Sequence, residues 1–306
     1  MLLTRSTCEY AGGMARLRVI APRFPIFLTS LALLAIPAAA HAQEQQVIEP
    51  DRPDVTNGTH IVDTGLLQVE IGALRTHVQP GRSAFGSPFT ARVGLFEWLE
   101  ARIGADGFVA QSDDAGRVSG FGNVQLGAKL RLWAEPGGMP VLSILPAVNV
   151  PTANADKGLG SGLEDFTIAV LTGKDLGRHG HVDANYGIGA IGSGNTATHF
   201  IQHLVSVSAS YAITDSWNPY LEAFWFSRQD SSGPSVTSID AGAIYQFGTR
   251  FAFDGGAQFG VTAEAPRFAL FGGVSVIVGD VLGRHGPEGR ARQARARSAA
   301  RSAKKK

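Results

Sequence analysis

The chain of 306 residues contains a single cysteine, Cys8. It falls within residues 1–42, which have the organisation of a secretory signal peptide. Arginines precede an 11-residue apolar run at 26–36, and Ala-His-Ala at 40–42 has the small-x-small pattern that signal peptidase needs. Met14 is the alternative start and gives a shorter leader. We expect a mature protein with no disulfide, no thiolate metal site, no cysteine nucleophile and no lipidated cysteine.

Long apolar runs are also lacking. After the signal peptide no stretch approaches the roughly 18 consecutive apolar residues of a membrane-spanning helix. The charge is uneven: 14 basic and 24 acidic residues lie between Gln43 and Gly283, whereas 9 basic residues and one acid follow from Arg284 to the end. We therefore expect residues 280–306 to form a disordered basic tail, and an exported chain of this kind is not expected to bind nucleic acid.

Apolar and polar residues alternate with a period of two, the pattern of β-strands with one apolar and one polar face. Leu67, Val69 and Ile71, for example, alternate with Gln68 and Glu70. Strands of soluble proteins average about 5–6 residues, whereas tilted membrane strands need about 9–11. About twelve segments alternate in this way, and most are of the longer kind; they cover residues 67–73, 89–95, 99–104, 124–132, 140–151, 164–174, 181–191, 200–212, 218–228, 237–247, 251–261 and 267–278.

Short turns alternate with long loops between these segments, as in outer-membrane barrels. The long loops are rich in Ser, Gly and Asp and lie near 77–88, 109–121, 152–163, 192–199 and 229–236. The sequence predicts an all-β fold, a transmembrane antiparallel up-and-down barrel of about 12 strands over residues 65–279. Residues 43–64 would be a periplasmic lead-in, and both termini would be periplasmic. A secreted soluble β-sandwich is the alternative, but its strands should be shorter and need not end in aromatic residues.

The chain resembles a known family at several points. Asp-Arg-Pro-Asp-Val-Thr at residues 51–56 looks like the N-terminal signature of the outer-membrane proteins described as "putative MetA-pathway of phenol degradation". The resemblance continues in order over roughly residues 47–278, through the segments 65–72, 93–104, 122–129, 150–152 and 160–166.

The resemblance implies a transporter-like outer-membrane barrel without assigned catalytic residues, and it links the solute to phenols only loosely. Its partners would be outer-membrane lipid, lipopolysaccharide and the barrel-assembly machinery. Two departures stand out. Ala153 replaces the glycine of the family's Pro-Thr-Gly, and the last strand runs into the basic tail where most such barrels end on an aromatic residue. The second departure puts recognition by the assembly machinery in question.

Charged residues share the polar parity of the strands. A charge costs about 2–4 kcal/mol at the lipid midplane, so these side chains must face the lumen. They could line a pore whose opposed charged walls orient a polar or amphipathic solute, or they could fill and stiffen a narrow lumen. The candidate pore-lining residues are Glu70, Arg92, Glu100, Arg102, Lys129, Arg131, Asp183, Glu222, Asp240 and Asp254.

Asp51, Arg52 and Asp54 precede the first strand by about a dozen residues. They could belong to a plug that folds into the lumen and restricts it. The favoured interpretation is a short periplasmic lead-in whose ion pairs anchor the first strand.

The pattern favours a channel or transporter for passive uptake or efflux of small solutes, aromatic or otherwise hydrophobic compounds included, with no cofactor. A non-conducting barrel with a structural or surface-interaction role is the alternative. A third interpretation, an outer-membrane hydrolase, needs a serine and a histidine close together on the lipid-facing surface. The best candidate, His203, has Val205 at the next position on its face, while Ser206 and Ser208 point inward. We therefore expect no enzymatic activity, and the histidines are not at a metal-ligand spacing.

Overall fold

The computed structural model describes residues 48–284 apart from 54, 80, 135–137 and 195. The expected signal peptide and all but the first residues of the expected basic tail lie outside this range. Across the described ranges, no helix is long and apolar enough to cross a membrane. The described residues include the 3-10 turn η2 (Ala155–Lys157) and fifteen strands: β1 (Leu66–Gln79), β2 (Arg82–Gly86), β3 (Phe89–Phe96), β4 (Leu99–Ala105), β5 (Phe108–Asp113), β6 (Gly116–Phe121), β7 (Val124–Trp133), β8 (Val141–Val150), β9 (Asp165–Leu176), β10 (Gly180–Ser193), β11 (Thr198–Tyr211), β12 (Trp217–Phe226), β13 (Val236–Phe247), β14 (Phe251–Gly260) and β15 (Phe268–Asp280).

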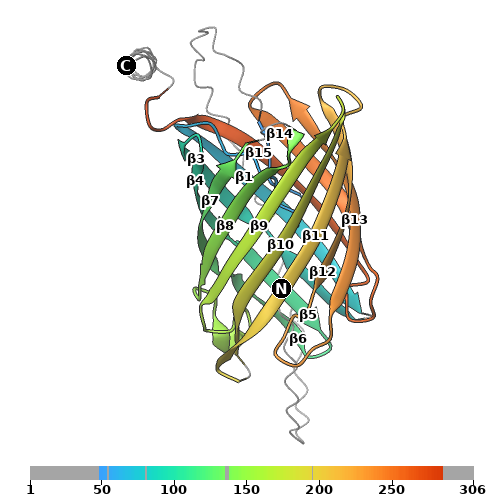
Figure 1. Cartoon of the computed structure of the whole chain (residues 1–306). Coiled ribbons are helices and arrows are strands. Elements are labelled where there is room, and N and C mark those ends of the chain that lie inside the picture. Colours follow the sequence, from blue (N-terminus) through green and yellow to red (C-terminus); the bar gives the residue numbers. More distant parts are fainter. Residues whose placement is uncertain (1–47, 54, 80, 135–137, 195, 285–306) are drawn as a thin grey trace, which may run out of the picture. The chain divides into compact units, whose positions relative to one another are not determined.

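All strands join one antiparallel sheet that closes on itself, because β15 pairs with β1. Three of the long strands are interrupted. β2 and β3 both pair with β1 and are two parts of one strand. In the same way, β4 and β5 are two parts of one strand, and so are β6 and β7. The result is a closed twelve-stranded barrel (Figure 1). The all-β barrel of about twelve antiparallel strands predicted from the alternation is confirmed.

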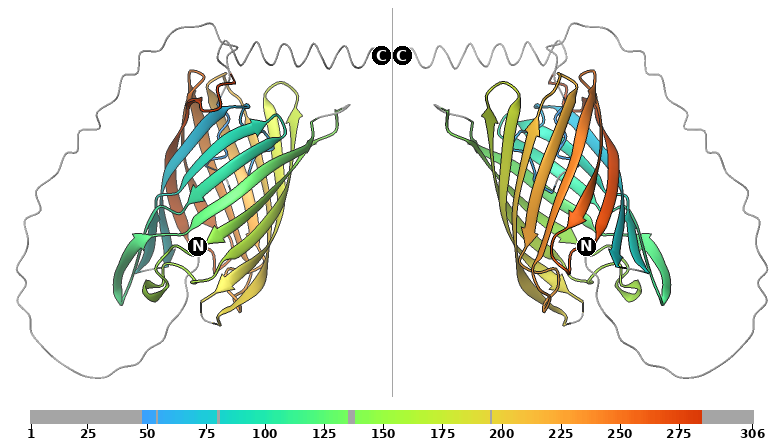
Figure 2. Two further views of the ribbon diagram at one scale, coloured as in Figure 1. Left: turned by 90° about the vertical axis from the view of Figure 1, so that its left-hand side faces the viewer. Right: turned by 90° about the vertical axis from the view of Figure 1, so that its right-hand side faces the viewer.

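Two of the expected loops are instead strands. Residues 77–88 contain the end of β1 and the whole of β2, and residues 109–121 form most of the β5–β6 hairpin, which extends the wall at one rim (Figure 2). Glycine and serine dilute the apolar alternation in these segments, so the sequence pattern resembled that of a loop. The expected loop near 152–163 does lie outside the strands and contains η2.

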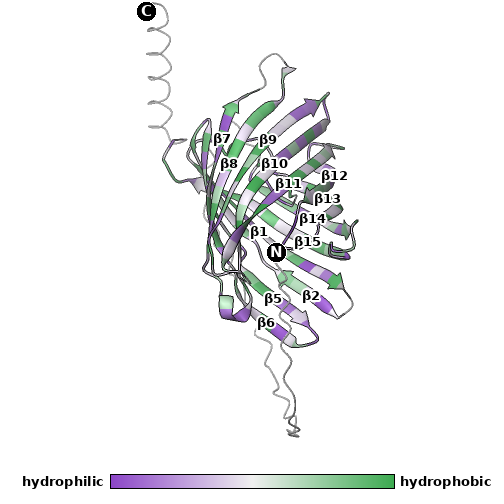
Figure 3. Ribbon diagram, turned by 60° about the horizontal axis from the view of Figure 1, so that its bottom comes forward, coloured by the Kyte–Doolittle hydropathy of each residue, from purple (hydrophilic) through white to green (hydrophobic). Residues whose placement is uncertain are grey.

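The barrel has two unlike ends. We call the end with the short connections, such as 97–98 and 248–250, the turn end, and the opposite end, with residues 151–164 and 227–235, the loop end. The outward face exposes large apolar side chains along each strand, Ile71, Ile103 and Leu126 among them. The alternation of apolar and polar residues along the strands is visible in Figure 3. Aromatic pairs such as Trp217–Tyr245, whose ring centroids are 5.1 Å apart, lie near the turn end, where an interfacial girdle is expected.

The small apolar core lies inside the barrel at the turn end. Ile48 packs there against Val62, Leu66, Ala252 and Ile277. Its backbone N–H donates to the Thr249 carbonyl at 3.0 Å, which ties it to the turn between β13 and β14. The chain therefore enters the barrel from the turn end before β1 begins.

Candidate functional site

The described residues of the segment 48–64, all but residue 54, lie in the lumen of the barrel, and we call this segment the plug. It starts at the turn end with Ile48, reaches Glu222 on β12 with Val55 and Thr56, and returns to the turn end at Thr64, which bridges to Gly94. The position of the described plug residues differs from the periplasmic lead-in favoured by the sequence. Contacts with the barrel wall determine the path of the plug backbone, and the sequence of the plug alone contains no pattern that predicts these contacts.

Arg92 on β3 is the central cation of a cluster of charged residues where the wall contacts the plug. Its guanidinium is fully buried, with Nη1 2.8 Å from Glu70 Oε1 and Nε 2.8 Å from Glu100 Oε1. β3 lies between β1 and β4, and Arg92 reaches both acids diagonally, because its direct cross-strand partners are Gln68 and Arg102. Both acids also hold the plug: Glu70 accepts from the Asp51 and Arg52 amides, and Glu100 accepts from the Val62 amide at 2.9 Å. Charges that would be costly in lipid are thus neutralised by one another and by plug backbone.

Asp51 is the acidic group that the plug contributes to this cluster. Its Oδ2 lies 2.6 Å from Arg102 Nη1, 2.7 Å from Lys129 Nζ and 3.5 Å from Arg92 Nη2. Lys129 also donates to the plug carbonyl of Gly58 at 2.8 Å. Burial alone would raise the pKa of the Asp51 carboxyl, but the adjacent Arg92, Lys129 and Arg102 cations outweigh burial and hold its pKa well below the ordinary value. With Asp51 seated, the cluster contains three cations and three carboxylates.

Two further contacts fix the tip of the plug. Glu222 accepts hydrogen bonds from the Val55 amide at 2.9 Å and from the backbone and hydroxyl of Thr56. Arg52 lies flat on the wall where β1 meets β15, and its Nη2 is 3.4 Å from Asp254 Oδ1. Gly72 and Gly273, paired across those strands, make room for it: a Cβ on Gly72 would fall 2.2 Å from the Arg52 guanidinium carbon.

The remaining predicted site residues are less closely involved with the plug. Asp240 lies beside Glu222 as its cross-strand partner on β13, and Arg131 pairs across from Ser143, whose hydroxyl donates to the plug carbonyl of Thr59. Asp183 lies near the turn end, where His181 contacts it at 3.1 Å. Asp54 lies outside the described residues.

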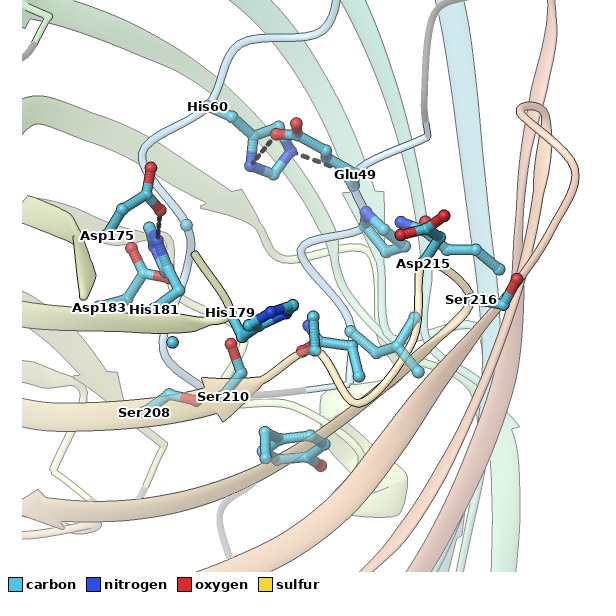
Figure 4. Close-up of a pocket in the computed structure, with 18 of the residues that line it drawn as sticks. Glu49, His60, Asp175, His179, His181, Asp183, Ser208, Ser210, Asp215 and Ser216 are labelled. Carbon is cyan, nitrogen blue, oxygen red and sulfur yellow. Dashed lines mark hydrogen bonds and ion pairs between the residues drawn. The ribbon is translucent and has the colours of Figure 1, made fainter. Parts of the chain in front are cut away.

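A cavity of about 550 Å³ remains between the plug and the wall formed by β9 to β13. The plug lines it with Asp51, Arg52 and His60, and the turns at 175–181 and 212–216 line it near the turn end. Figure 4 shows Glu49 against His60 on the plug side, and Asp175 and Asp183 around His181 on the wall. In the described part of the chain, no group of three or more His, Cys, Asp or Glu residues is arranged to hold a metal ion.

The lumen has a different lining toward the loop end. There the inward positions of β10 to β13 carry apolar side chains, which we call the phenylalanine patch: Ile191, Phe200, Phe224, Phe226 and Val236. The cross-strand pairs Ile191–Phe200 and Phe226–Val236 place these side chains on one face. The rings of Phe224 and Phe226 are 6.0 Å apart at nearly a right angle.

The family model described as "Putative MetA-pathway of phenol degradation" matches residues 50–277. The chain belongs to this family. No curated protein sequence matches it. Among solved structures it is similar to the COG4313 outer membrane channel from Pseudomonas putida F1, with a TM-score of 0.56 and 14% identity over 75% of this chain and 99% of that one. It is also similar to the NanC porin, with a TM-score of 0.50 and 9% identity over 69% of this chain and 100% of the porin. At these identities the likeness concerns the fold, which is that of outer-membrane channels and porins.

The sequence missed several groups that this family member uses to seat the plug. His60 and the backbone of residues 55–62 carry no charge pattern that points to the lumen. Gly72 and Gly273 did offer a signal, since each stands at an inward position of a strand where a side chain would fill space. His203, the hydrolase candidate, lies on the outer wall, where its Nδ1 is 2.9 Å from the Tyr186 hydroxyl.

Proposed function

We propose that the protein is an outer-membrane channel for small solutes whose lumen is closed by the plug and opens when the plug shifts. The observation that supports this proposal most directly is how the plug is held. Its described residues join the wall through side-chain contacts, such as those of Asp51 and Glu222, and through single backbone hydrogen bonds rather than as a strand of the sheet. Polar contacts of this kind can be exchanged for water or solute without opening the barrel.

In the membrane, we propose that the turn end faces the periplasm and the loop end faces the outside. Long loops outside and short turns inside are the common arrangement of outer-membrane barrels. The cavity beside the plug would then be a periplasmic vestibule, and the phenylalanine patch would line the outer half of the lumen.

The phenylalanine patch favours aromatic or otherwise hydrophobic solutes. The inward apolar side chains on β10 to β13 pack together, with Ile191, Phe200, Phe224 and Val236 only 3–8% exposed, and they give this part of the lumen an apolar lining for a solute that passes it. The link of the family's description to phenol degradation points in the same direction. In this proposal the protein transports and carries out no catalysis.

A non-conducting barrel is the second candidate, because the plug occupies the turn-end half of the lumen beside the cavity. Planar-bilayer recording separates the two. We expect rare, short conductance steps from the wild type and frequent, larger steps after deletion of residues 48–61. Heat-modifiable gel migration checks that the deleted protein still forms a barrel. A folded deletion variant that conducts no better than the wild type would support the non-conducting barrel.

A further inference from the structure

The cation pair Arg102 and Lys129 has an unusual arrangement around Asp51. Both cations are on the wall, on the paired strands β4 and β7, and both point to one oxygen of a carboxylate that belongs to the plug. Arg92 already forms two ion pairs with carboxylates of the wall, those of Glu70 and Glu100. Asp51 is therefore the carboxylate on which Arg102 and Lys129 chiefly depend.

Withdrawal of the plug changes the charge of this part of the wall. Arg92, Arg102 and Lys129 would remain against Glu70 and Glu100, so one positive charge would have no counter-ion. Lys129 would also lose the carbonyl oxygens of Gly58 and His60, which accept from it at 2.8 Å and 3.3 Å. Water that enters the open lumen screens this positive charge, whereas an anionic group of a solute pairs with it directly, so the uncompensated charge favours an anion at this position.

A solute in the cavity beside the plug can reach Asp51, because Asp51 and Arg52 line this cavity. Arg102 and Lys129 lie behind Asp51, with side chains 12% and 0% exposed, and they are reached as Asp51 leaves. The phenylalanine patch lies farther along the lumen, toward the loop end, and is not part of this cavity, so a solute that passes through the barrel meets the apolar side chains and the cations at different depths.

We propose that Arg102 and Lys129 form a carboxylate-binding site for the transported solute, and that Asp51 occupies this site in the closed barrel as an internal stand-in for the ligand. The solute is then an amphipathic acid, an aromatic or aliphatic body with one carboxylate. Its carboxylate replaces that of Asp51 on the two cations, so binding of the solute and release of the plug are coupled. The inference rests on the proposed channel function and adds the solute class and the opening step.

Calorimetric titration of the full chain in detergent tests the site, with benzoate and benzyl alcohol as probes that differ in the carboxylate. In Asp51→Asn the competing carboxylate is gone, so benzoate should bind at least about tenfold more tightly than to the wild type. Benzyl alcohol should bind both proteins equally. Glu97→Gln removes the same charge in the exposed turn between β3 and β4, and it should leave benzoate binding unchanged.

A second substitution shows whether the two cations are the site. Lys129→Gln in the Asp51→Asn background should return the benzoate affinity toward that of the wild type, with heat-modifiable migration as the check on folding. Equal tightening in Glu97→Gln, or tight benzoate binding that survives loss of Lys129, would overturn the carboxylate site. Neither result depends on conductance. A deletion variant that conducts while Asp51→Asn fails to bind benzoate would sink this inference and leave the channel standing.

Discussion

The two halves of the lumen differ in the chemistry of their walls, and therefore in which groups can occupy them. At the turn end the wall presents buried charges, Arg92, Glu100 and Lys129 among them; they pair partly with one another, and the plug supplies the remaining partners. Toward the loop end the wall presents Phe200 and Phe224, which need no partner. A charged wall thus specifies its occupant through matched donors and acceptors, whereas an apolar wall accepts any apolar body of suitable size.

The orientation of these two halves gives the largest expected difference. Cysteines placed at Asp156 in η2 and at Glu97 in the β3–β4 turn lie at opposite ends of the barrel. With the loop end outside, an impermeant thiol reagent on intact cells should label Asp156→Cys and leave Glu97→Cys unlabelled. Disruption of the outer membrane should make the second site reactive. The reverse labelling pattern would exchange the outer and periplasmic assignments of the two halves.

Arg92→Gln removes the charge on which the turn-end half depends. Glu70 and Glu100 would be left buried without their main cation, and loss of one partner of a buried ion pair costs about 3–5 kcal/mol. We expect a large drop in the temperature at which the folded, heat-modifiable band is lost. Arg75→Gln on the outer wall, where Arg75 is exposed, is the matched control and should shift this temperature little. Equal shifts of this temperature in the two variants would show that the buried charge cluster does not stabilise the barrel more than an exposed arginine does.

Gly72→Ala tests the seat of Arg52 without any change in charge. The new Cβ would overlap the guanidinium, so Arg52 must move or the plug must lift, at a cost of about 1–3 kcal/mol. We expect more frequent channel openings than in the wild type. Gly279→Ala on β15 is the control, because a Cβ there meets nothing within 4 Å. Arg52→Ala should remove the effect of Gly72→Ala, and persistence of that effect would mean that the glycine has another role.

Acid should have the smallest effect on the turn-end half. The pKa of Asp51 is lower when the plug is seated than its ordinary value of 3.8. Its contribution is therefore complete above that value and is lost only as the pH falls below it. Opening frequency recorded at pH 7 and pH 5 should consequently not rise on acidification. A clear rise would show that a group other than Asp51 controls the closed state.

The sequence predicted the strands of the barrel wall better than the position of the plug inside the barrel. Alternation identified the strands because a side chain on every second residue must meet lipid, and it placed Glu70 beside Arg92 and Glu100 beside Lys129 as observed. It missed β5 and β6, where glycine and serine interrupt the apolar face. It also favoured the wrong position for the described residues of the plug. The Asp51 carboxylate could form ion pairs either in a periplasmic lead-in or in the lumen. Its partners, Arg102 and Lys129, are distant in the sequence and decide between these positions.

Thiol modification of single channels during recording tests the central claim, that the plug itself closes the lumen, most directly. Asn57 lies at the deep part of the plug, and a cysteine there should be shielded while the plug is seated. We expect a charged thiol reagent added at the turn end to react with Asn57→Cys only during openings, and the modified channel to stay open because the adduct prevents reseating. Reaction at the same rate in closed and open periods, or modification without any change in conductance, would contradict the claim that the plug closes the channel.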